Sequence, residues 1–402
     1  MVAARLAILG AGPIGLETAL EGAARGFDVR VFESRAIGAA ALDWGHVRMF
    51  SPWSMNASAR GRERLARAGW TMPDEAELPT GRELVERYLR PMASLPELQG
   101  RLETGWRVVA VGREGLLKGE RVGSDERLRF PFRLLLQDAE GRERFENADL
   151  VADCTGVWEN PRGMGEGGLP APGERTALDR IARRIEDVRG GSRERYARRT
   201  TLLVGSGHSA ATAAIDFAAL AGEAPGTRVV WIFRAGGPDP LTGVADDALP
   251  ERARIVEAAN RIARGASAAV ESRAGASIRG IVRSGDRLDV ELSVFGGSET
   301  VGVDRILACT GFGPDETIYR ELQIHQCYAS LGPMKLAAAL GGEGGGDCLA
   351  QKSFGPDSLR SPDPGFLILG AKSYGRSANF LLRVGHEQVR DAFVLFEGWR
   401  GG

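Results

Sequence analysis

The chain is poor in cysteine and has no long apolar run. Only four cysteines occur among its 402 residues, and no two of them form a C-x-x-C pair. This spacing argues against a zinc knuckle or a thioredoxin-type dithiol, and no metal site is predicted. The scarcity of cysteine favours a reducing compartment. No apolar run approaches the roughly 20 residues that a membrane-spanning helix needs, so we expect no membrane span.

A strong charge of either sign is also lacking. Fifty-two basic residues face 53 acidic ones, for a net charge of -1. This balance provides no basic field for nucleic acid and no acidic tail. The hydrophobic content of 43% is that of a globular protein, and the length is enough for two domains. The first apolar strand begins within a few residues of Met1, which leaves no room for a signal peptide, so we expect a cytoplasmic protein.

Two glycine-rich turns each follow a short apolar strand, Leu6–Leu9 or Thr201–Val204, and precede a helical pattern. The first turn consists of Gly10, Ala11, Gly12, Pro13, Ile14 and Gly15, and the second of Gly205, Ser206, Gly207, His208, Ser209 and Ala210. Strand, tight turn and helix in this order are typical of a dinucleotide-binding site. Two such turns in one chain suggest two nucleotides arranged for hydride transfer.

The spacing within the first turn suits a pyrophosphate, which needs close backbone N–H groups and the positive end of a helix dipole. Gly10 permits the tight turn, Gly12 lets the backbone approach the phosphates, and Gly15 lets the helix pack on the strand. Glu33, about 20 residues further on, is placed to accept a hydrogen bond from a ribose hydroxyl. The alternative is a glycine turn of an ordinary α/β domain with an acid nearby by chance.

The second turn differs at its acid position. Ala210 stands at the third glycine position, which the fingerprint permits. The following strand, Arg228–Phe233, ends at Arg234 rather than at an acid. An arginine there indicates a 2′-phosphate and hence NADPH, although a plain surface arginine would look the same. We expect His208 to face NADP(H) or solvent rather than to catalyse.

Further elements follow from apolar periodicity. In the first part we predict a helix over Ile14–Arg25, a strand over Asp28–Glu33, mostly helical structure over 34–94, a meander with strands Trp106–Val111 and Phe132–Gln137, and a strand over 150–154. After a Gly/Pro-rich crossover at 160–174 we predict helices over 177–188, Ser209–Leu220 and Glu251–Arg264, and strands near Ala268, Ile278 and Leu288 and over Val303–Cys309. Gly341–Gly346 is expected to be a loop, and Phe366–Gly370 and Gly385–Phe396 a closing strand and helix.

These motifs resemble the flavoproteins that are built from two dinucleotide-binding domains. That group includes class B flavin-dependent monooxygenases and thioredoxin-reductase-like enzymes. The strand-ending segments Asp153–Gly156 and Ala308–Asp315 match its domain crossings. The resemblance implies an α/β fold of two Rossmann-like domains, the second inserted in the first. Residues 1–165 and 305–402 would bind FAD, and residues 166–304 would bind NADP(H).

The resemblance also implies site residues beyond the turns. Expected cofactor contacts are Trp44, His46, Val108, Thr155, Gly156, Gly311, Ser373, Glu387 and Gln388. Arg48, in an aromatic and polar cluster that would lie along the flavin, could bind NADPH or a charged substrate, but the cluster could equally be a loop that only packs. Lys372 could stabilise the anionic reduced flavin, and the N-terminus of the last helix would bring His386, as a neutral imidazole, to the same ring edge. Arg48, Lys372 and His386 are therefore the candidate catalytic residues.

Three family features are absent from the sequence. The reductase branch carries Gly-Asp after the last strand, whereas this chain has Gly370-Ala371-Lys372, so the flavin contact would come from Ser373 or Asn379. A redox cysteine pair is missing, and so is the monooxygenase fingerprint F-x-G-x-x-x-H. Cys327 and Cys348 are either ordinary buried thiols or a thiol site for a soft substrate.

Without a dithiol, oxygen is the most available acceptor for the electrons of a reduced flavin. We therefore predict an FAD-containing, NADPH-dependent monooxygenase of a small soft nucleophile (nitrogen, sulfur or a trivalent metalloid). The alternatives are a reductase that passes electrons to a quinone, metal or protein partner, and a non-catalytic flavin- or NADPH-binding sensor. A homodimer is left open. The substrate is not encoded in any recognisable motif.

Overall fold

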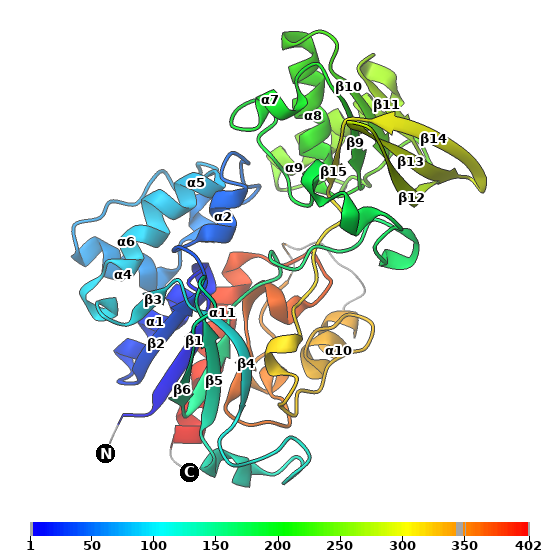
Figure 1. The fold of residues 1–402 in the computed structure, drawn as a ribbon. Helices are drawn as coiled ribbons and strands as arrows, with labels where there is room; N and C mark the ends of the chain where they lie inside the picture. The colour runs from blue at the N-terminus through cyan, green and yellow to red at the C-terminus, as the bar shows by residue number, and fades with distance from the viewer. Residues whose placement is uncertain (1–2, 343–348, 350, 401–402) are drawn as a thin grey trace. The chain divides into compact units, whose positions relative to one another are not determined.

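The computed structural model describes residues 3–342, 349 and 351–400 of the chain (Figure 1). The chain divides into two compact units. Unit 1 comprises Met1–Leu42, Ser51–Asn160 and Gly313–Gly402, and unit 2 comprises Asp43–Phe50 and Pro161–Phe312. The second unit is thus inserted in the first, as predicted. Which cofactor each unit binds, and the predicted cofactor-domain boundaries, stay predictions.

Unit 1 is built on a five-stranded parallel sheet with the order β16-β7-β1-β2-β3. Unit 1 also contains a separate antiparallel sheet, β4-β5-β6. The strands of the two sheets are β1 (Arg5–Leu9), β2 (Asp28–Glu33), β3 (Leu102–Thr104), β4 (Arg107–Arg113), β5 (Phe132–Gln137), β6 (Glu143–Ala148), β7 (Leu150–Asp153) and β16 (Phe366–Ile368). Its helices are α1 (Pro13–Ala24), α2 (Ala39–Asp43), α3 (Trp53–Asn56), α4 (Ala59–Arg67), α5 (Gly81–Leu84), α6 (Arg90–Ala93), α10 (Met334–Gly342) and α11 (Leu382–Arg400).

The sheet of unit 1 is covered on both faces. Helices α1 and α11 pack together, and the ring of Phe27, which follows α1, lies 5.6 Å from the ring of Phe393 in α11. The antiparallel meander β4-β5-β6 covers the other face through a buried apolar cluster that includes Leu9, Phe132 and Leu134. This arrangement of helix, parallel sheet and meander buries the apolar side chains of both sheet faces.

Unit 2 repeats the same three layers. Its parallel sheet has the order β11-β10-β9-β15-β8, and its meander is β12-β13-β14. Its strands are β8 (Ile181–Ala182), β9 (Thr200–Val204), β10 (Arg228–Ile232), β11 (Val270–Arg273), β12 (Ala276–Ser284), β13 (Arg287–Val294), β14 (Gly297–Val303) and β15 (Arg305–Ala308), and its helices are α7 (Arg193–Tyr196), α8 (His208–Glu223) and α9 (Pro250–Arg261). Along β9, Leu203 joins the core under the helices, while Leu202 and Val204 join the core under the meander. This alternation is the period of a strand that is buried on both faces.

Two predicted elements differ from the structure. The helix expected over 177–188 is replaced by a 3-10 turn, Leu178–Arg180, and by strand β8. The helical spacing of its apolar residues is overridden because Ile181 pairs with Ile306 at the edge of the parallel sheet. The last helix begins at Leu382 rather than near Gly385, so His386 lies in its second turn.

The helices of the described residues include none that is long and apolar enough to cross a membrane. Gly341 and Gly342, the first residues of the predicted glycine loop, instead end helix α10. The rest of that loop, residues 343–346, lies outside the described residues, and so does Cys348.

Candidate functional site

The first glycine turn joins β1 to α1 at the carboxyl edge of the sheet in unit 1. Gly10 has a φ of +95°, and a β-carbon there would lie 2.9 Å from the carbonyl oxygen of Cys154 at the end of β7. A β-carbon on Gly15 would collide with the carbonyl oxygen of Gly10. Gly12, in contrast, faces open space, with nothing within 4 Å of the position that a β-carbon would take. Two glycines are therefore required by packing, and one leaves room for a ligand.

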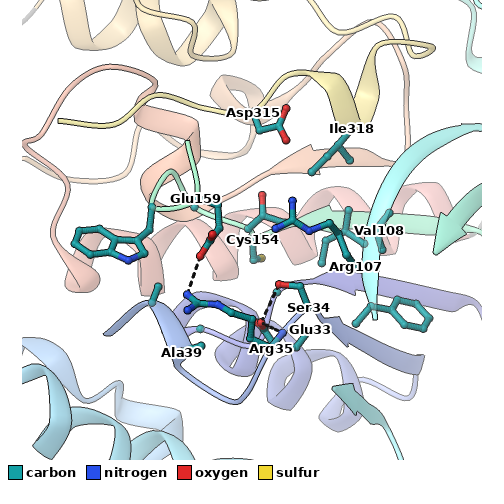
Figure 2. A pocket seen from close by; sticks show the side chains of 18 of the residues that line it. Glu33, Ser34, Arg35, Ala39, Arg107, Val108, Cys154, Glu159, Asp315 and Ile318 are labelled. Carbon is teal, nitrogen blue, oxygen red and sulfur yellow. Dashed lines mark hydrogen bonds and ion pairs between the residues drawn. The ribbon is translucent and has the colours of Figure 1, made fainter. Parts of the chain in front are cut away.

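The turn opens into a cleft of about 220 Å³ (Figure 2). In this sheet the chain order reverses between β1 and β7, and the crevice at such a switch point is where open α/β sheets bind ligands. The lining residues come from the ends of β1, β2 and β7 and from β4, and include Gly10, Gly12, Pro13, Glu33, Arg35, Val108, Thr155 and Gly156. Of the predicted FAD contacts, the structure thus brings together the first turn, Glu33, Val108, Thr155 and Gly156.

Glu33 is fixed at the rim of this cleft by backbone donors. Its Oε2 accepts a hydrogen bond of 2.8 Å from the N–H of Ala11, and its Oε1 accepts one of 2.8 Å from the N–H of Arg35. The Arg35 guanidinium pairs with Glu159 at 2.7 Å, which joins the segment after β2 to the segment after β7 (Figure 2). The carboxylate is therefore a preorganised acceptor beside the open glycine turn.

The loop after β16 is tied to the last helix by a buried network. Gln388 accepts a hydrogen bond of 3.0 Å from the N–H of Gly370 and donates one of 3.0 Å to the hydroxyl of Ser373. Glu387 accepts hydrogen bonds from the N–H of Ser353 and from Arg383. These contacts give Ser373, Glu387 and Gln388 structural partners, and their predicted contacts with FAD stay predictions.

Of the two predicted catalytic groups of this region, Lys372 is fully buried and His386 is half-buried. The Lys372 ammonium lies 2.6 Å from the Asp153 carboxylate, and neither side chain is exposed. Burial, followed by the positive charge of Arg390, lowers the pKa of His386 to about 4. The imidazole is neutral at pH 7, as predicted, but the cause is not the helix N-terminus, because the dipole effect fades beyond the first turn.

The second glycine turn repeats the geometry of the first. Gly205 has a φ of +130°, and a β-carbon there would collide with the carbonyl oxygen of Cys309 at the end of β15. Gly207 faces open space, and α8 begins at His208. Ser206, His208 and Ser209 are exposed, while Ala210 is buried. The order of strands reverses between β9 and β15, so this turn also lies at a switch point.

Two other predicted residues of unit 2, Arg234 and Gly311, follow strands β10 and β15 of its parallel sheet. Arg234 is exposed just beyond the end of β10. Gly311 has a φ of +80° and accepts a hydrogen bond of 3.0 Å from the N–H of Arg162. The ring of Phe50 meets that of His208 edge to face at 5.0 Å. Although its side chain is exposed, desolvation by neighbouring groups, followed by the charge of Arg252, lowers the pKa of His208.

The aromatic segment Asp43–Phe50 belongs to unit 2, whereas the sequence interpretation placed Trp44 and His46 along the flavin of the first domain. Asp43 pairs with Arg184 at 3.8 Å, and burial lowers the pKa of His46, which also feels the charge of Asp187. Exposed Arg48 adds to the effect of Arg254 in lowering the pKa of Glu251. The assignment of this segment to unit 2 arises from long-range packing that local sequence does not reveal, and the predicted contacts of Trp44 and His46 with FAD stay predictions.

The described cysteines fall into two kinds. Cys154 and Cys309 end equivalent strands in the two units, and burial raises the pKa of both thiols. Cys327 lies on a loop, and hydrogen bonds from Ser330 and from the backbone lower its pKa. All three are free thiols.

Sequence reasoning missed Asp153, Tyr319 and the pairing of Arg35 with Glu159. One signal was available for Asp153, because the tripeptide Cys-Thr-Gly occurs twice, at 154–156 and 309–311, and only the first copy follows an acid. No local sequence signal marked Tyr319, Arg35 or Glu159.

A comparison with protein-family models and with curated protein sequences finds no match. Solved structures match over nearly the whole chain. Bacillithiol disulfide reductase from Bacillus cereus aligns at 18% identity and a TM-score of 0.69, covering 98% of this chain and 100% of its own. Ornithine N-hydroxylase from Kutzneria sp. 744, solved with reduced FAD, NADP+ and L-ornithine, aligns at 18% identity and a TM-score of 0.61. The alignment covers 99% of this chain and 100% of the hydroxylase chain. Thioredoxin reductase from Lactococcus lactis aligns at 15% identity and a TM-score of 0.62, and the alignment covers 98% of this chain and 99% of the reductase chain. The chain therefore has the fold of the flavoproteins with two dinucleotide-binding domains.

Proposed function

We propose that the protein is an FAD-containing, NADPH-dependent oxidoreductase. The observation that carries this proposal is the repetition of one geometry in both units. Each glycine turn lies at a switch point, is closed at its first glycine by a cysteine carbonyl and is open at its second. A site of this kind offers backbone N–H groups and a helix N-terminus to a pyrophosphate. Two such sites would bind one nucleotide that donates a hydride and one that accepts it.

The residues of unit 1 fit FAD. Gly12 leaves space for the phosphates, Glu33 presents a fixed carboxylate for a ribose, and Val108, Thr155 and Gly156 wall the cleft. Unit 2 would hold NADPH, with Gly207 at the pyrophosphate and Arg234 at the 2′-phosphate. Bound FAD would supply the chemistry of accepting a hydride and passing its electrons onward.

Within this class we propose a monooxygenase that acts on a nitrogen, sulfur or trivalent metalloid centre. One oxygen atom of O₂ would form a bond to the lone pair of the substrate, and the other would leave as water, with NADPH supplying two electrons. In support of oxygen as the electron acceptor, Cys154 and Cys309 are half-buried free thiols whose pKa values are raised, which disfavours thiol–disulfide exchange. The structural likeness to ornithine N-hydroxylase also favours it.

A reductase is the second candidate, and Cys327 favours it. This free thiol has a lowered pKa and so has more of the nucleophilic thiolate. The structural likeness to bacillithiol disulfide reductase points the same way. Electrons would then pass to a disulfide, a quinone, a metal or a protein.

The test is anaerobic addition of NADPH to the flavin-loaded protein, followed by oxygen and a panel of a thioether, a primary amine and a trivalent metalloid oxyanion. Flavin bleaching by NADPH and an oxygenated product formed in step with NADPH and oxygen consumption would support the monooxygenase. Oxygen-independent turnover with a disulfide or quinone would favour the reductase. A bound flavin that NADPH cannot reduce would contradict both and favour a sensor.

A further inference from the structure

A buried ion pair lies directly behind the wall of the unit 1 cleft. The Nζ of Lys372 is 2.6 Å from Oδ2 of Asp153 and 3.1 Å from the hydroxyl of Thr155. It also lies 5.0 Å from the centre of the Tyr319 ring. Neither charged side chain has any exposed surface. Lys372 therefore faces a carboxylate and an aromatic ring, not open solvent.

Thr155 is held by both members of this pair. Its backbone N–H and its hydroxyl donate hydrogen bonds of 3.1 and 2.7 Å to Oδ1 of Asp153, while the hydroxyl accepts one from Lys372. Thr155 and the following Gly156, whose φ is +69°, both line the cleft. The position of the cleft wall thus depends on two charged groups behind it.

The second unit holds its copy of the same tripeptide without charge. Ala308 stands where unit 1 has Asp153, and the hydroxyl of Thr310 donates a hydrogen bond of 2.8 Å to the carbonyl oxygen of Arg162. A Cys-Thr-Gly segment at this place in the fold therefore needs no ion pair. Because burying two charges costs solvation energy that their attraction does not always offset, the pair in unit 1 calls for a function beyond folding.

The other end of the pair is rigidly anchored. Lys372 lies in the 3-10 turn Gly370–Tyr374, which Gln388 binds at its first N–H. At the end of this turn, a β-carbon on Gly375 would collide with the carbonyl oxygen of Ser330. The ammonium group is thus presented to Asp153 from a loop that cannot shift freely.

We propose that Asp153 and Lys372 are positioning residues that set the Thr155–Gly156 wall of the cleft for a bound dinucleotide. This inference rests on the proposed FAD site. It also replaces the expectation that Lys372 acts on the flavin directly, because its charge is already matched by Asp153.

The test is FAD titration of flavin-free, full-length protein by fluorescence, with thermal unfolding in parallel. Lys372→Met and Asp153→Asn should each raise the Kd for FAD about tenfold, and the double variant should raise it by less than the product of the two because the sites are coupled. Thr155→Val, which leaves the ion pair intact, should have a similar effect. Thr155→Ser should retain wild-type affinity, and Thr310→Val in unit 2 is the matched control, with no expected change in FAD affinity.

Wild-type affinity in both Lys372→Met and Thr155→Val, or independent effects of Asp153→Asn and Lys372→Met, would overturn the inference. So would an altered flavin reduction potential in Lys372→Met with an unchanged Kd, because that result would assign Lys372 a direct electrostatic role. If the wild-type protein binds no FAD, the proposed function fails instead. The two failures are therefore distinguishable, and the Thr155 variants remain informative if a charge variant does not fold.

Discussion

The carbonyl oxygen of Cys154 occupies the space that a side chain on Gly10 would need, at 2.9 Å from its β-carbon position. The carbonyl oxygen of Cys309 stands in the same relation to Gly205. At each switch point, the first glycine of the turn is thereby in backbone contact with the cysteine that directly follows the neighbouring strand, β7 or β15. The second glycine of each turn has no such neighbour, so packing and ligand binding depend on different glycines.

Alanine substitutions should separate these two roles. Gly12→Ala, at a φ of -80° and in open space, should leave the thermal midpoint of the flavin-free protein unchanged but raise the Kd for FAD by about tenfold or more, since a methyl group would intrude on the phosphates. Gly207→Ala should do the same for NADPH. Gly10→Ala is the contrasting variant, which should lower the thermal midpoint itself. A flavin-free Gly12→Ala protein that is strongly destabilised would contradict this division.

Arg234 is predicted to distinguish NADPH from NADH. Arg234→Ala should raise the KM for NADPH by about 10- to 100-fold, the loss expected for a hydrogen-bonded charge on a phosphate, and leave the KM for NADH nearly unchanged. Arg228→Ala is the matched control, because Arg228 is an exposed arginine at the opposite end of the same strand. Equal effects of Arg234→Ala on both nucleotides would refute the assignment.

Asp363 forms a buried clamp with two arginines that should dominate the acid stability of unit 1. It pairs with Arg113 at 2.8 Å and with Arg127 at 2.9 Å, and none of the three side chains is exposed. Asp363→Asn should lower the free energy of unfolding by about 3–5 kcal/mol at pH 7, because two buried cations would lose their partner. Asp149→Asn, which affects the half-exposed pair with Arg5, should cost within about 1 kcal/mol.

The same clamp gives a pH dependence of known sign. Burial alone would raise the pKa of Asp363, but the hydrogen bond from Arg127 and the charge of Arg113 outweigh it and lower the pKa. The stabilisation that ionised Asp363 gives to the folded state is therefore complete above its unfolded-state pKa of about 3.9. It is lost as the pH falls through the lower pKa of the folded state. Denaturant unfolding of wild-type and Asp363→Asn protein should differ most above pH 4 and converge in stronger acid. A constant difference across this range would disprove the linkage.

Phe50 should control the ionisation of His208. Desolvation by neighbouring groups and the charge of Arg252 lower the pKa of this exposed histidine, and the Phe50 ring packs edge to face against it. Phe50→Ala would remove part of this desolvation, so the pKa of His208 should rise towards about 6.5. The chain has only four histidines, which makes their NMR titration practical. Phe295→Ala, a truncation of an exposed ring in the same unit, should leave the titration of His208 unchanged.

The fold was predictable from sequence because its strongest signals are local. Each glycine turn carries its strand and helix with it, and the strand Asp28–Glu33 has the bounds expected from its pattern. The helix predicted over 177–188 failed because pairing of Ile181 with Ile306, residues far apart in the chain, decided its structure. The position of Asp43–Phe50 in unit 2 likewise depends on Arg184 and His208, which no local pattern connects to it.

The candidate site was predictable to the same extent. Glu33, Val108 and Thr155 follow from motif spacing and from the resemblance, and all three line the cleft. Lys372 was recognised as an unusual residue, but its partner Asp153 lies more than two hundred positions earlier in the chain. A buried pair of this kind leaves no periodic trace in sequence, because only the folded chain brings Asp153 and Lys372 together.

The two kinds of glycine also bear on how such a protein would diverge. A lineage that stopped using one nucleotide would still need Gly10 or Gly205, since the cysteine carbonyl remains in place whether or not a ligand is present. It would be free to replace Gly12 or Gly207 by a residue with a side chain. In descendants of this chain, a retained second glycine would therefore indicate that a nucleotide is still bound. A retained first glycine would indicate only that the domain still folds.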